Sequence, residues 1–254
     1  MGTTDQAGLI ELGIDAGRNL KLINFAVVCV AALASCSGSQ TNAPDYFPLT
    51  PGYSWEYALT TNYHVDTRYQ KKLVRNLRSV QLDEQEVFVQ RTQAYDLSYY
   101  QKVGRGVTRV ATRADDALRL TPDAEQHWVL PSPPELGSHW PLTSRLRLVE
   151  AKTFAMQDRL APVTFEVDLT YSIDSLDAET TVPAGRFAHC LLVRAVGQTQ
   201  VPVNRGNGRA LIEVEHRDWY APQVGLVRSE RWERSDSVFL HEGRYVLELL
   251  NYSH

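Results

Sequence analysis

Apolar and polar residues alternate with a period of two along most of the chain after Tyr46. The clearest run is Thr164–Ile173, in which five apolar side chains alternate with five polar ones. Because successive side chains of a β-strand point to opposite faces, this run predicts an antiparallel strand with one buried face. Shorter or less regular runs predict eleven more strands: Tyr53–Tyr63, Tyr69–Leu82, Glu86–Tyr95, Ser98–Val103, Val107–Arg113, His127–Leu130, Leu146–Lys152, Ala188–Gln200, Ala210–Tyr220, Leu226–Arg234 and Arg244–Leu250.

Turn signals separate these runs as an antiparallel sheet requires. Val182-Pro183-Ala184-Gly185 carries Pro and Gly at the positions that a type I turn prefers, and Asn207-Gly208 can supply the positive φ angles of a tight hairpin. Ala221–Gly225 is expected to reverse the chain once more, and Ala114–Leu120 could form a short helix. The expected fold class is therefore mainly β: an antiparallel curved sheet, barrel or sandwich of about twelve strands with few short helices.

A Gly-x-x-Trp element stands on each side of the proline-rich break at residues 131–134, once as Gly52–Trp55 and once as Gly137–Trp140. One interpretation is that the β-rich domain, residues 46–254, consists of two related halves, 46–130 and 134–254. The other is that each tryptophan anchors the core at the start of a strand, after a turn that the glycine permits. The sequence leaves both open.

The N-terminal part has a different pattern. Leu22–Ser35 is apolar except for Asn24 and Ser35, and Arg18 and Lys21 precede it. A transmembrane helix needs about 20 apolar residues, so this shorter run predicts a signal peptide over residues 1–35, with a buried helix as the alternative. Residues 1–17 contain three acidic and no basic residues, unlike the start of a signal peptide, which suggests that translation begins nearer to Arg18.

The apolar run ends in Leu33-Ala34-Ser35-Cys36, which resembles the lipobox at which bacteria cut a signal peptide and attach lipid to the new N-terminal cysteine. The resemblance implies that Cys36 is the lipid attachment site and that residues 36–45 form a lipidated tether. Two or three acyl chains would hold such a protein on a membrane. Because Ser rather than Asp follows the cysteine, the resemblance also implies the outer membrane, facing the periplasm.

The chain after residue 35 has 219 residues, enough to bury a core, with 24 Lys and Arg against 27 Asp and Glu. This near balance gives no reason to expect nucleic acid or an anionic membrane surface as a partner. With Cys29 removed and Cys36 lipidated, Cys190 has no partner for a disulfide. We interpret it as a buried small hydrophobe, with a nucleophile as the alternative, although the adjacent His189 would point to the opposite face.

Three further segments carry a wider resemblance. They are Tyr46-Phe47-Pro48-Leu49 leading to Gly52 and Trp55, Thr181–Phe187 with its Val-Pro-Ala-Gly-x-Phe core, and Trp219–Val227 with Trp-Tyr-Ala-Pro-x-Val-Gly-Leu-Val. Together they resemble a broad group of bacterial envelope lipoproteins with an uncharacterised β-rich domain. The resemblance implies fold and compartment and assigns no catalytic residue. Where the usual pattern has Gly before Val-Gly-Leu-Val, this chain has Gln223.

No phosphate-binding glycine loop, Gly-x-Ser-x-Gly, His-Glu-x-x-His or Cys-x-x-Cys motif occurs, so the sequence predicts no cofactor and no catalytic residue. The weak metal candidates are His64 with Asp66 and His216 with Asp218, because residues two apart on a strand share a face. The plainer interpretation is a solvated strand face with an ion contact.

The charges of the last strands allow two interpretations. Glu213, Glu215 and Arg217 could pair with Arg228 and Glu230 across a hairpin and set its register, or form a docking face for an envelope protein. The five tryptophans and twelve tyrosines could fill a core or line a cavity for a lipid.

The function we expect is a lipid-anchored periplasmic protein acting as a non-catalytic envelope interaction or accessory module. The alternative is a carrier or binder of a hydrophobic ligand, and a hydrolase comes third.

Overall fold

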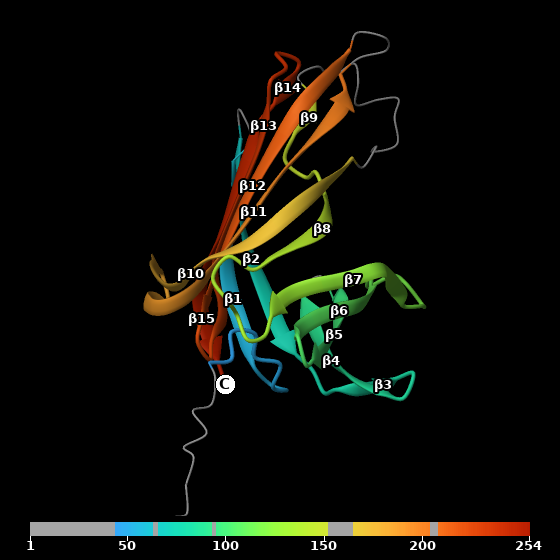
Figure 1. Ribbon diagram of the computed structural model, residues 1–254, viewed down its shortest axis with the longest axis vertical. Coiled ribbons are helices and arrows are strands. Elements are labelled where there is room, and N and C mark those ends of the chain that lie inside the picture. The colour runs from blue at the N-terminus through green and yellow to red at the C-terminus, as the bar shows by residue number, and fades with distance from the viewer. Residues whose placement is uncertain (1–43, 63–65, 93–94, 152–164, 204–207) are drawn as a thin grey trace, which may run out of the picture. The chain divides into compact units, whose positions relative to one another are not determined.

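The computed structural model describes residues 44–254 except 63–65, 93–94, 152–164 and 204–207, all within the compact unit Asn42–His254 (Figure 1). The described residues form strands, turns and loops and contain no helix. The strands are β1 (Ser54–Asn62), β2 (Thr67–Asn76), β3 (Val80–Leu82), β4 (Gln85–Thr92), β5 (Leu97–Val103), β6 (Gly106–Arg113), β7 (Thr121–Pro131), β8 (His139–Arg145), β9 (Glu150–Ala151), β10 (Glu166–Val182), β11 (Gly185–Pro202), β12 (Arg209–Ala221), β13 (Gly225–Ser235), β14 (Leu240–His241) and β15 (Gly243–Ser253).

Thirteen of these strands form one sheet, in the order β7-β6-β5-β4-β2-β1-β15-β13-β12-β11-β10-β8 with β3 beside β4, while β9 and β14 form a separate pair. Every pairing is antiparallel, and most join neighbours in sequence, as in Figure 1. The main exception is the pairing of β1 with β15, which joins the two ends of the domain in mid-sheet. The predicted mainly β, antiparallel fold is confirmed, and the strand order is open from β7 to β8 rather than closed.

The period-two prediction holds best in β10, where Val167, Leu169 and Ile173 are each 1% exposed. This strand extends to Val182 and pairs with the 18-residue β11, so the hairpin is longer than its alternation predicted. Register shifts between Ile173 and Thr180 interrupt the pairing. Bulges of this kind bend a long strand, which explains why the apolar alternation is lost in its second half.

Four local predictions are corrected. No helix forms over Ala114–Leu120. The Ala117 amide donates to the Ala114 carbonyl at 3.0 Å, which closes one turn, and the Asp115 amide donates to the Asp96 carboxylate at 3.2 Å. The run Tyr69–Leu82 divides into β2 and β3. The expected strand Leu146–Lys152 is reduced to Glu150–Ala151 in the described residues, because the amides of residues 147–149 bond to a carboxylate instead of a strand. Strand β8 was not expected.

The predicted turns are confirmed where the structure describes them. Pro183 and Ala184 connect β10 to β11 ahead of Gly185, whose φ is +136°. Between β12 and β13, Gln223 has a φ of +64°, the left-handed region that favours glycine, and its amide donates to the Asp45 carbonyl at 2.8 Å. Gln223 thus adopts a backbone conformation that glycine reaches without a steric cost. Asn207 lies outside the described residues.

The two Gly-x-x-Trp elements have the same local structure. In each, a glycine with positive φ precedes a strand whose second residue is a tryptophan: Trp55 in β1 is 4% exposed and Trp140 in β8 is 7% exposed. Their settings differ, since β1 has a neighbour on both sides and β8 is paired with β10 alone. Both tryptophans therefore pack into the core at the start of a strand, and the two related halves stay a prediction.

Candidate functional site

The predicted pair His216 and Asp218 belongs to a polar cluster on the face of β12 and β13 that also carries the buried Val214 and Ser229, here called the inner face. His216 Nε2 lies 3.0 Å from Asp218 Oδ1, 3.0 Å from Ser229 Oγ on β13 and 3.4 Å from the Tyr245 hydroxyl on β15. The side chains of His216 and Asp218 are 13% and 11% exposed. For this pair the expectation of a solvated strand face is therefore wrong, although the two residues do share a face and do touch.

Strand register assembles this cluster. Asp218 lies directly opposite Ser229, and the rings of Tyr171 and Tyr245 meet His216 edge-on. Burial raises the pKa of the Asp218 carboxyl, but the His216 charge and hydrogen bonds from His216, Ser229 and Tyr220 outweigh it and lower the pKa below its usual value. The cluster thus keeps a buried carboxylate ionised.

The geometry of the cluster differs from that of a hydrolase triad. A Ser-His-Asp relay needs the carboxylate on one imidazole nitrogen and the hydroxyl on the other. Here Asp218 and Ser229 both contact Nε2 of His216, and Nδ1 is buried without a hydrogen-bond partner. The cluster cannot move a proton from Ser229 to Asp218 through the ring, so it supports a structural role.

The other predicted site residues are not brought to this cluster within the described structure. Asp66 precedes β2, is exposed and accepts a hydrogen bond from Arg68 Nε at 3.0 Å. Cys36 and His64 lie outside the described residues. In the part of the chain that the structure describes, no three His, Cys, Asp or Glu side chains form a group that could hold a metal ion.

A buried ion pair, Arg231 with Glu233 on β13, was missed by the sequence analysis. The two side chains are 4% and 0% exposed and meet at 2.8 Å. The Glu233 carboxylate also accepts the backbone amides of Arg147, Leu148 and Val149 at 2.8 to 3.2 Å. The alternation of charged residues along Leu226–Arg234 was the only sequence signal, and it did not reveal which of these charges are buried.

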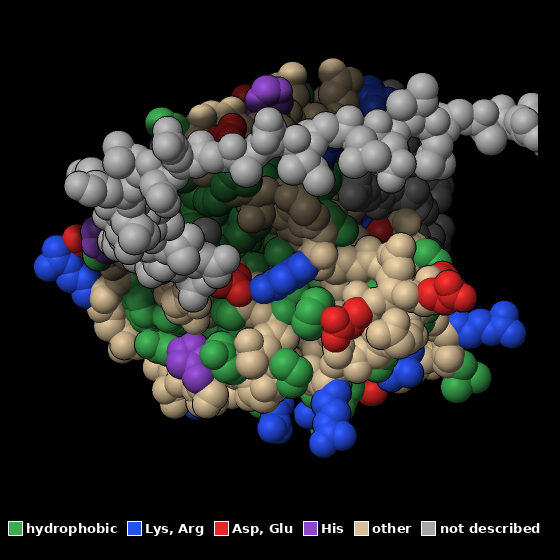
Figure 2. All heavy atoms as spheres, turned by 60° about the horizontal axis from the view of Figure 1, so that its bottom comes forward, with side chains coloured by type: hydrophobic (Ala, Val, Ile, Leu, Met, Phe, Trp, Pro, Cys, Tyr) green, Lys and Arg blue, Asp and Glu red, His purple; other side chains and the backbone are tan. Residues whose placement is uncertain are grey.

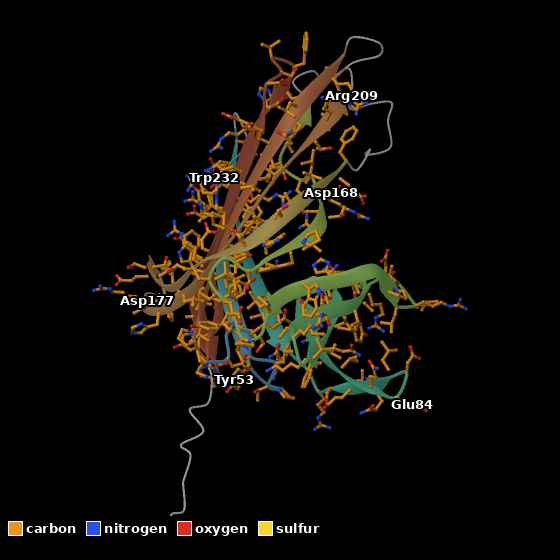
Figure 3. All side chains as sticks on the ribbon, viewed as in Figure 1. Tyr53, Glu84, Asp168, Asp177, Arg209 and Trp232 are labelled. Atoms are coloured by element: carbon orange, nitrogen blue, oxygen red, sulfur yellow. The ribbon has the colours of Figure 1, made fainter. Side chains whose placement is uncertain are left out.

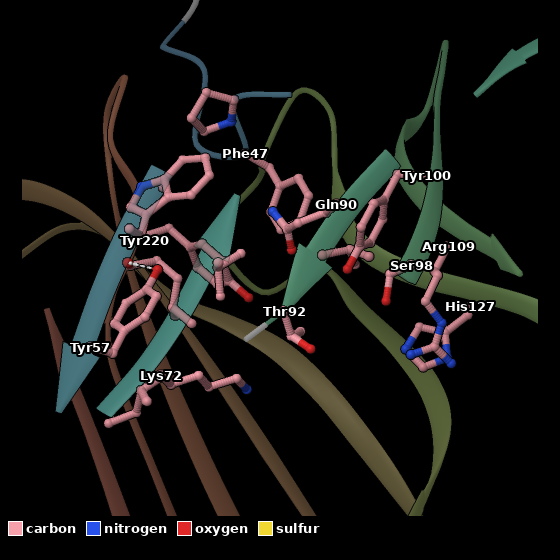
Figure 4. Close-up of a pocket in the computed structure, with 17 residues that line it drawn as sticks. Phe47, Tyr57, Lys72, Gln90, Thr92, Ser98, Tyr100, Arg109, His127 and Tyr220 are labelled. Carbon is pink, nitrogen blue, oxygen red and sulfur yellow. Dashed lines mark hydrogen bonds between the residues drawn. The ribbon is translucent and has the colours of Figure 1, made fainter. Parts of the chain in front are cut away.

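A partly open cavity of about 320 Å³ lies on one face of the sheet from β15 to β7 (Figure 4). Strand register creates its wall: Trp55 faces Val74, and Val74 faces Thr92 on the next strand. Strand β4 ends in this row at Thr92, whose amide donates to the Asp96 carbonyl at 2.9 Å. The lining residues are Phe47, Pro48, Trp55, Tyr57, Lys72, Val74, Gln90, Thr92, Ser98, Tyr100, Arg109, His127, Val129, Tyr220, Gly225, Leu226 and Leu247.

The cavity has an apolar side and a polar side. Trp55, Val74 and Leu247 are buried, and the Trp55 indole donates to the Val224 carbonyl at 2.7 Å, which leaves its ring to form the apolar wall. On the other side, Figure 4 shows Lys72 extending toward Thr92, with Ser98, Arg109 and His127 beyond. Such a division suits a ligand with one apolar and one polar end.

The basic side chains on the polar side of the cavity differ in their partners and in their pKa shifts. Arg109 is neutralised by Asp123 through two hydrogen bonds of 2.9 and 3.0 Å, and it also contacts His127 Nδ1 at 3.1 Å. Desolvation and the Arg109 charge lower the pKa of His127 to about 4, so this imidazole is neutral at pH 7 and accepts from Arg109. Desolvation, followed by the charge of Arg147, lowers the pKa of Lys72 from its usual value.

A second cavity, of about 280 Å³, lies beside the N-terminal segment. Phe47 lines both cavities, and its ring packs against Tyr100 at 5.2 Å. The segment is held by a 2.8 Å ion pair between Asp45 and Lys102. Phe47 therefore forms part of the boundary between the two cavities.

The outer face of the long strands carries the charges for which two interpretations were left open. Glu215 pairs with Arg194 on β11 and with Arg217 on its own strand, and Arg228 reaches Glu248 on β15 at 3.2 Å. Opposite charges also face each other in register, as Arg217 does Glu230. Figure 3 shows Trp232 on the side of these strands away from β7 and β8. Between β12 and β13 themselves, Arg234 lies 3.9 Å from Glu215, and a role of these charges in setting the register stays a prediction.

Exposed charges of both signs are interspersed on the face drawn in Figure 2, as the near-neutral composition implies.

Cys190 is 0% exposed, and burial raises the pKa of its thiol to about 11. His189 points away from it and contacts Asp177 at 2.6 Å. The expectation of a buried cysteine, separated from its neighbouring histidine, is confirmed.

Comparisons with known proteins find only distant similarity to this chain. No protein-family model matches it, and no curated protein matches it. Two crystal structures do. One is a candidate lipoprotein from Parabacteroides distasonis, with a TM-score of 0.42, 14% identity, and 84% of this chain and 100% of that chain covered. The other is a candidate exported protein with a YmcC-like fold from Bacteroides fragilis, with a TM-score of 0.38, 13% identity, and 83% and 100% covered.

Among the described residues, no helix has the length and apolar character needed to cross a membrane.

Proposed function

We propose that this chain is a lipid-anchored protein of the bacterial envelope that acts as an accessory module by binding a small amphiphilic molecule. The observation that supports this most is the 320 Å³ cavity with its apolar and polar sides. Ligand sites in proteins begin at about this size and combine an apolar lining with a few polar groups. The proposal unites the two functions that the sequence favours, an interaction module and a binder of a hydrophobic ligand.

The size of the cavity limits the ligand. At roughly 30 Å³ for each water-sized group, the cavity has room for about ten non-hydrogen atoms. This corresponds to a short alkyl chain with a polar head, or to one end of a longer lipid that leaves through the open side. Burial of alkyl carbons against Trp55, Val74 and Leu247 would stabilise the complex by about 0.8 kcal/mol for each CH₂.

The anchor in this proposal is Cys36. Seven residues lie between it and Pro44, which lines the second cavity. A flexible tether of this length reaches roughly 15 Å, so the domain would stay close to the bilayer that supplies amphiphiles. The outer membrane, facing the periplasm, is the surface we propose.

Two experiments test the proposal. Radiolabelled palmitate should enter the wild-type chain and not Cys36→Ala, and incorporation into that variant would contradict the assignment of the anchor. Calorimetry should show one octanol or octanoate bound per wild-type chain, and Leu247→Trp, which fills the cavity, should abolish binding. Val246→Trp adds the same ring to the opposite face of β15, where Val246 pairs regularly with Thr60 and Glu230, and should bind like wild type. Absence of binding to the wild-type chain would refute the cavity as a ligand site.

A further inference from the structure

The charges around the larger cavity specify one end of its ligand. Seventeen residues line this cavity, and none of them is Asp or Glu. Besides His127, which is neutral at pH 7, the basic side chains of the lining are Lys72 and Arg109. Arg109 already has a carboxylate partner in Asp123, at 2.9 Å. Within the described structure, Lys72 has neither an ion pair nor a hydrogen bond.

The neighbouring Lys71 shows that the missing partner is specific to the cavity face. Lys71 and Lys72 are consecutive residues of β2, so their side chains point to opposite faces of the sheet. Lys71 pairs with Glu56 at 2.5 Å on the outer face. Lys72 lies opposite Tyr57, two pairs along from Trp55 and Val74 and therefore on the same face of the sheet as the row that lines the cavity.

The position of Lys72 suits the head group of an amphiphile. It is exposed to solvent and also lines the cavity, so its ammonium group can meet both a bound head group and water. After desolvation, the charge that lowers the pKa of Lys72 is that of another cation, Arg147, which likewise has no side-chain ion pair in the described residues. A second unpaired cation beside the first strengthens the attraction for an anion.

We propose that the larger cavity binds an anionic amphiphile, with Lys72 contacting the anionic head group and Trp55, Val74 and Leu247 contacting the alkyl chain. This inference rests on the proposed function and names the ligand class. A carboxylate or a phosphate ester satisfies the chemistry equally, because both accept charge-assisted hydrogen bonds from an ammonium group. A neutral or cationic amphiphile would gain the apolar contacts but not this bond.

The test compares head groups of different charge on the same alkyl chain. Octanoate, octyl phosphate, octanol and octylamine are titrated calorimetrically into the lipidated mature chain in neutral phosphatidylcholine vesicles, with protein-free vesicles as the reference. We expect the two anions to bind at least roughly fivefold more tightly than octanol, and octylamine to bind most weakly. The ranking of octanoate and octyl phosphate distinguishes the two anion classes.

Matched variants assign the effect to one residue. Lys72→Met should reduce the affinity for the anions by about tenfold and leave octanol within twofold of wild type. Lys71→Met removes an equal charge from the opposite face and should leave all four affinities unchanged. Equal wild-type affinities for octanoate and octanol would overturn the inference while leaving the proposed function intact, as would equal losses in the two lysine variants. Binding of no probe would refute both.

Discussion

Replacement of Glu233 by Ala should cause a large loss of stability. The Glu233 carboxylate is 0% exposed, accepts Arg231 Nε at 2.8 Å and accepts the amides of Arg147, Leu148 and Val149. Glu233→Ala leaves the Arg231 guanidinium buried without a counter-charge. Breaking a buried pair in this way costs about 3–5 kcal/mol, because the remaining charge stays desolvated.

The loss of the three amide hydrogen bonds lowers the free energy of unfolding by a smaller amount. Residues 147–149 lie in a loop whose first side chain is exposed, so part of their hydrogen bonding can be replaced by water. We therefore expect the free energy of unfolding to fall by about 4 kcal/mol in Glu233→Ala, a large share of the 5–15 kcal/mol typical of a domain. Glu233→Gln should cost less, since it keeps the volume and one acceptor oxygen.

Guanidinium denaturation of the wild type and variants measures this loss, and Glu248→Ala is the matched control. Glu248 is also paired with an arginine, Arg228 at 3.2 Å, but its side chain is 32% exposed. The loss there should stay below about 1 kcal/mol. Amide hydrogen exchange should accelerate at Arg147, Leu148 and Val149 in the Glu233 variant alone. Losses that agree within 1 kcal/mol for the two variants would refute the reasoning.

Three further predictions follow from burial and packing. His127 titrates near pH 4 when folded and near 6.5 when unfolded, so the unfolded chain binds more protons between these values. Stability should fall by up to about 3 kcal/mol as the pH drops from 6.5 to 4, and a pH series on His127→Gln should lack this component. Cys190 should resist Ellman's reagent in the native chain and react after unfolding, and fast native labelling would contradict its burial. Gly197→Ala should destabilise by about 1–3 kcal/mol in thermal melts, because a Cβ there overlaps the Asp168 carbonyl, whereas Gly104→Ala meets nothing within 4 Å and should be neutral.

Sequence reasoning succeeded where the signal was local. The alternation of Val167, Leu169 and Ile173 predicted a strand with one buried face because the period of two is a property of the strand backbone itself. The placement of His216 and Asp218 on a shared face was predicted for the same reason. Proline and glycine located the β10–β11 turn because they restrict or free φ at single positions.

The prediction failed where both faces of a strand carry polar residues. In β12, Glu215 and Arg217 alternate with His216 and Asp218, so the pattern contains no hydrophobic face to identify the buried one. Only packing against neighbouring strands decides that His216 and Asp218 are inside. Arg231 and Glu233 were missed for this reason. An arginine and a glutamate two residues apart look the same in the sequence whether the ion pair they form is buried or exposed.

The sequence by itself determined the antiparallel β class, the turns, the burial of Cys190 and the absence of familiar catalytic motifs. The tertiary structure alone decided that β1 pairs with β15, that Glu233 binds a loop more than 80 residues before it in the chain, and that Lys72 faces a cavity while Lys71 faces an ion pair. The physical reason is that strand character depends on each residue and its neighbours, whereas strand order, register and the face on which a cavity forms depend on contacts between residues far apart in sequence.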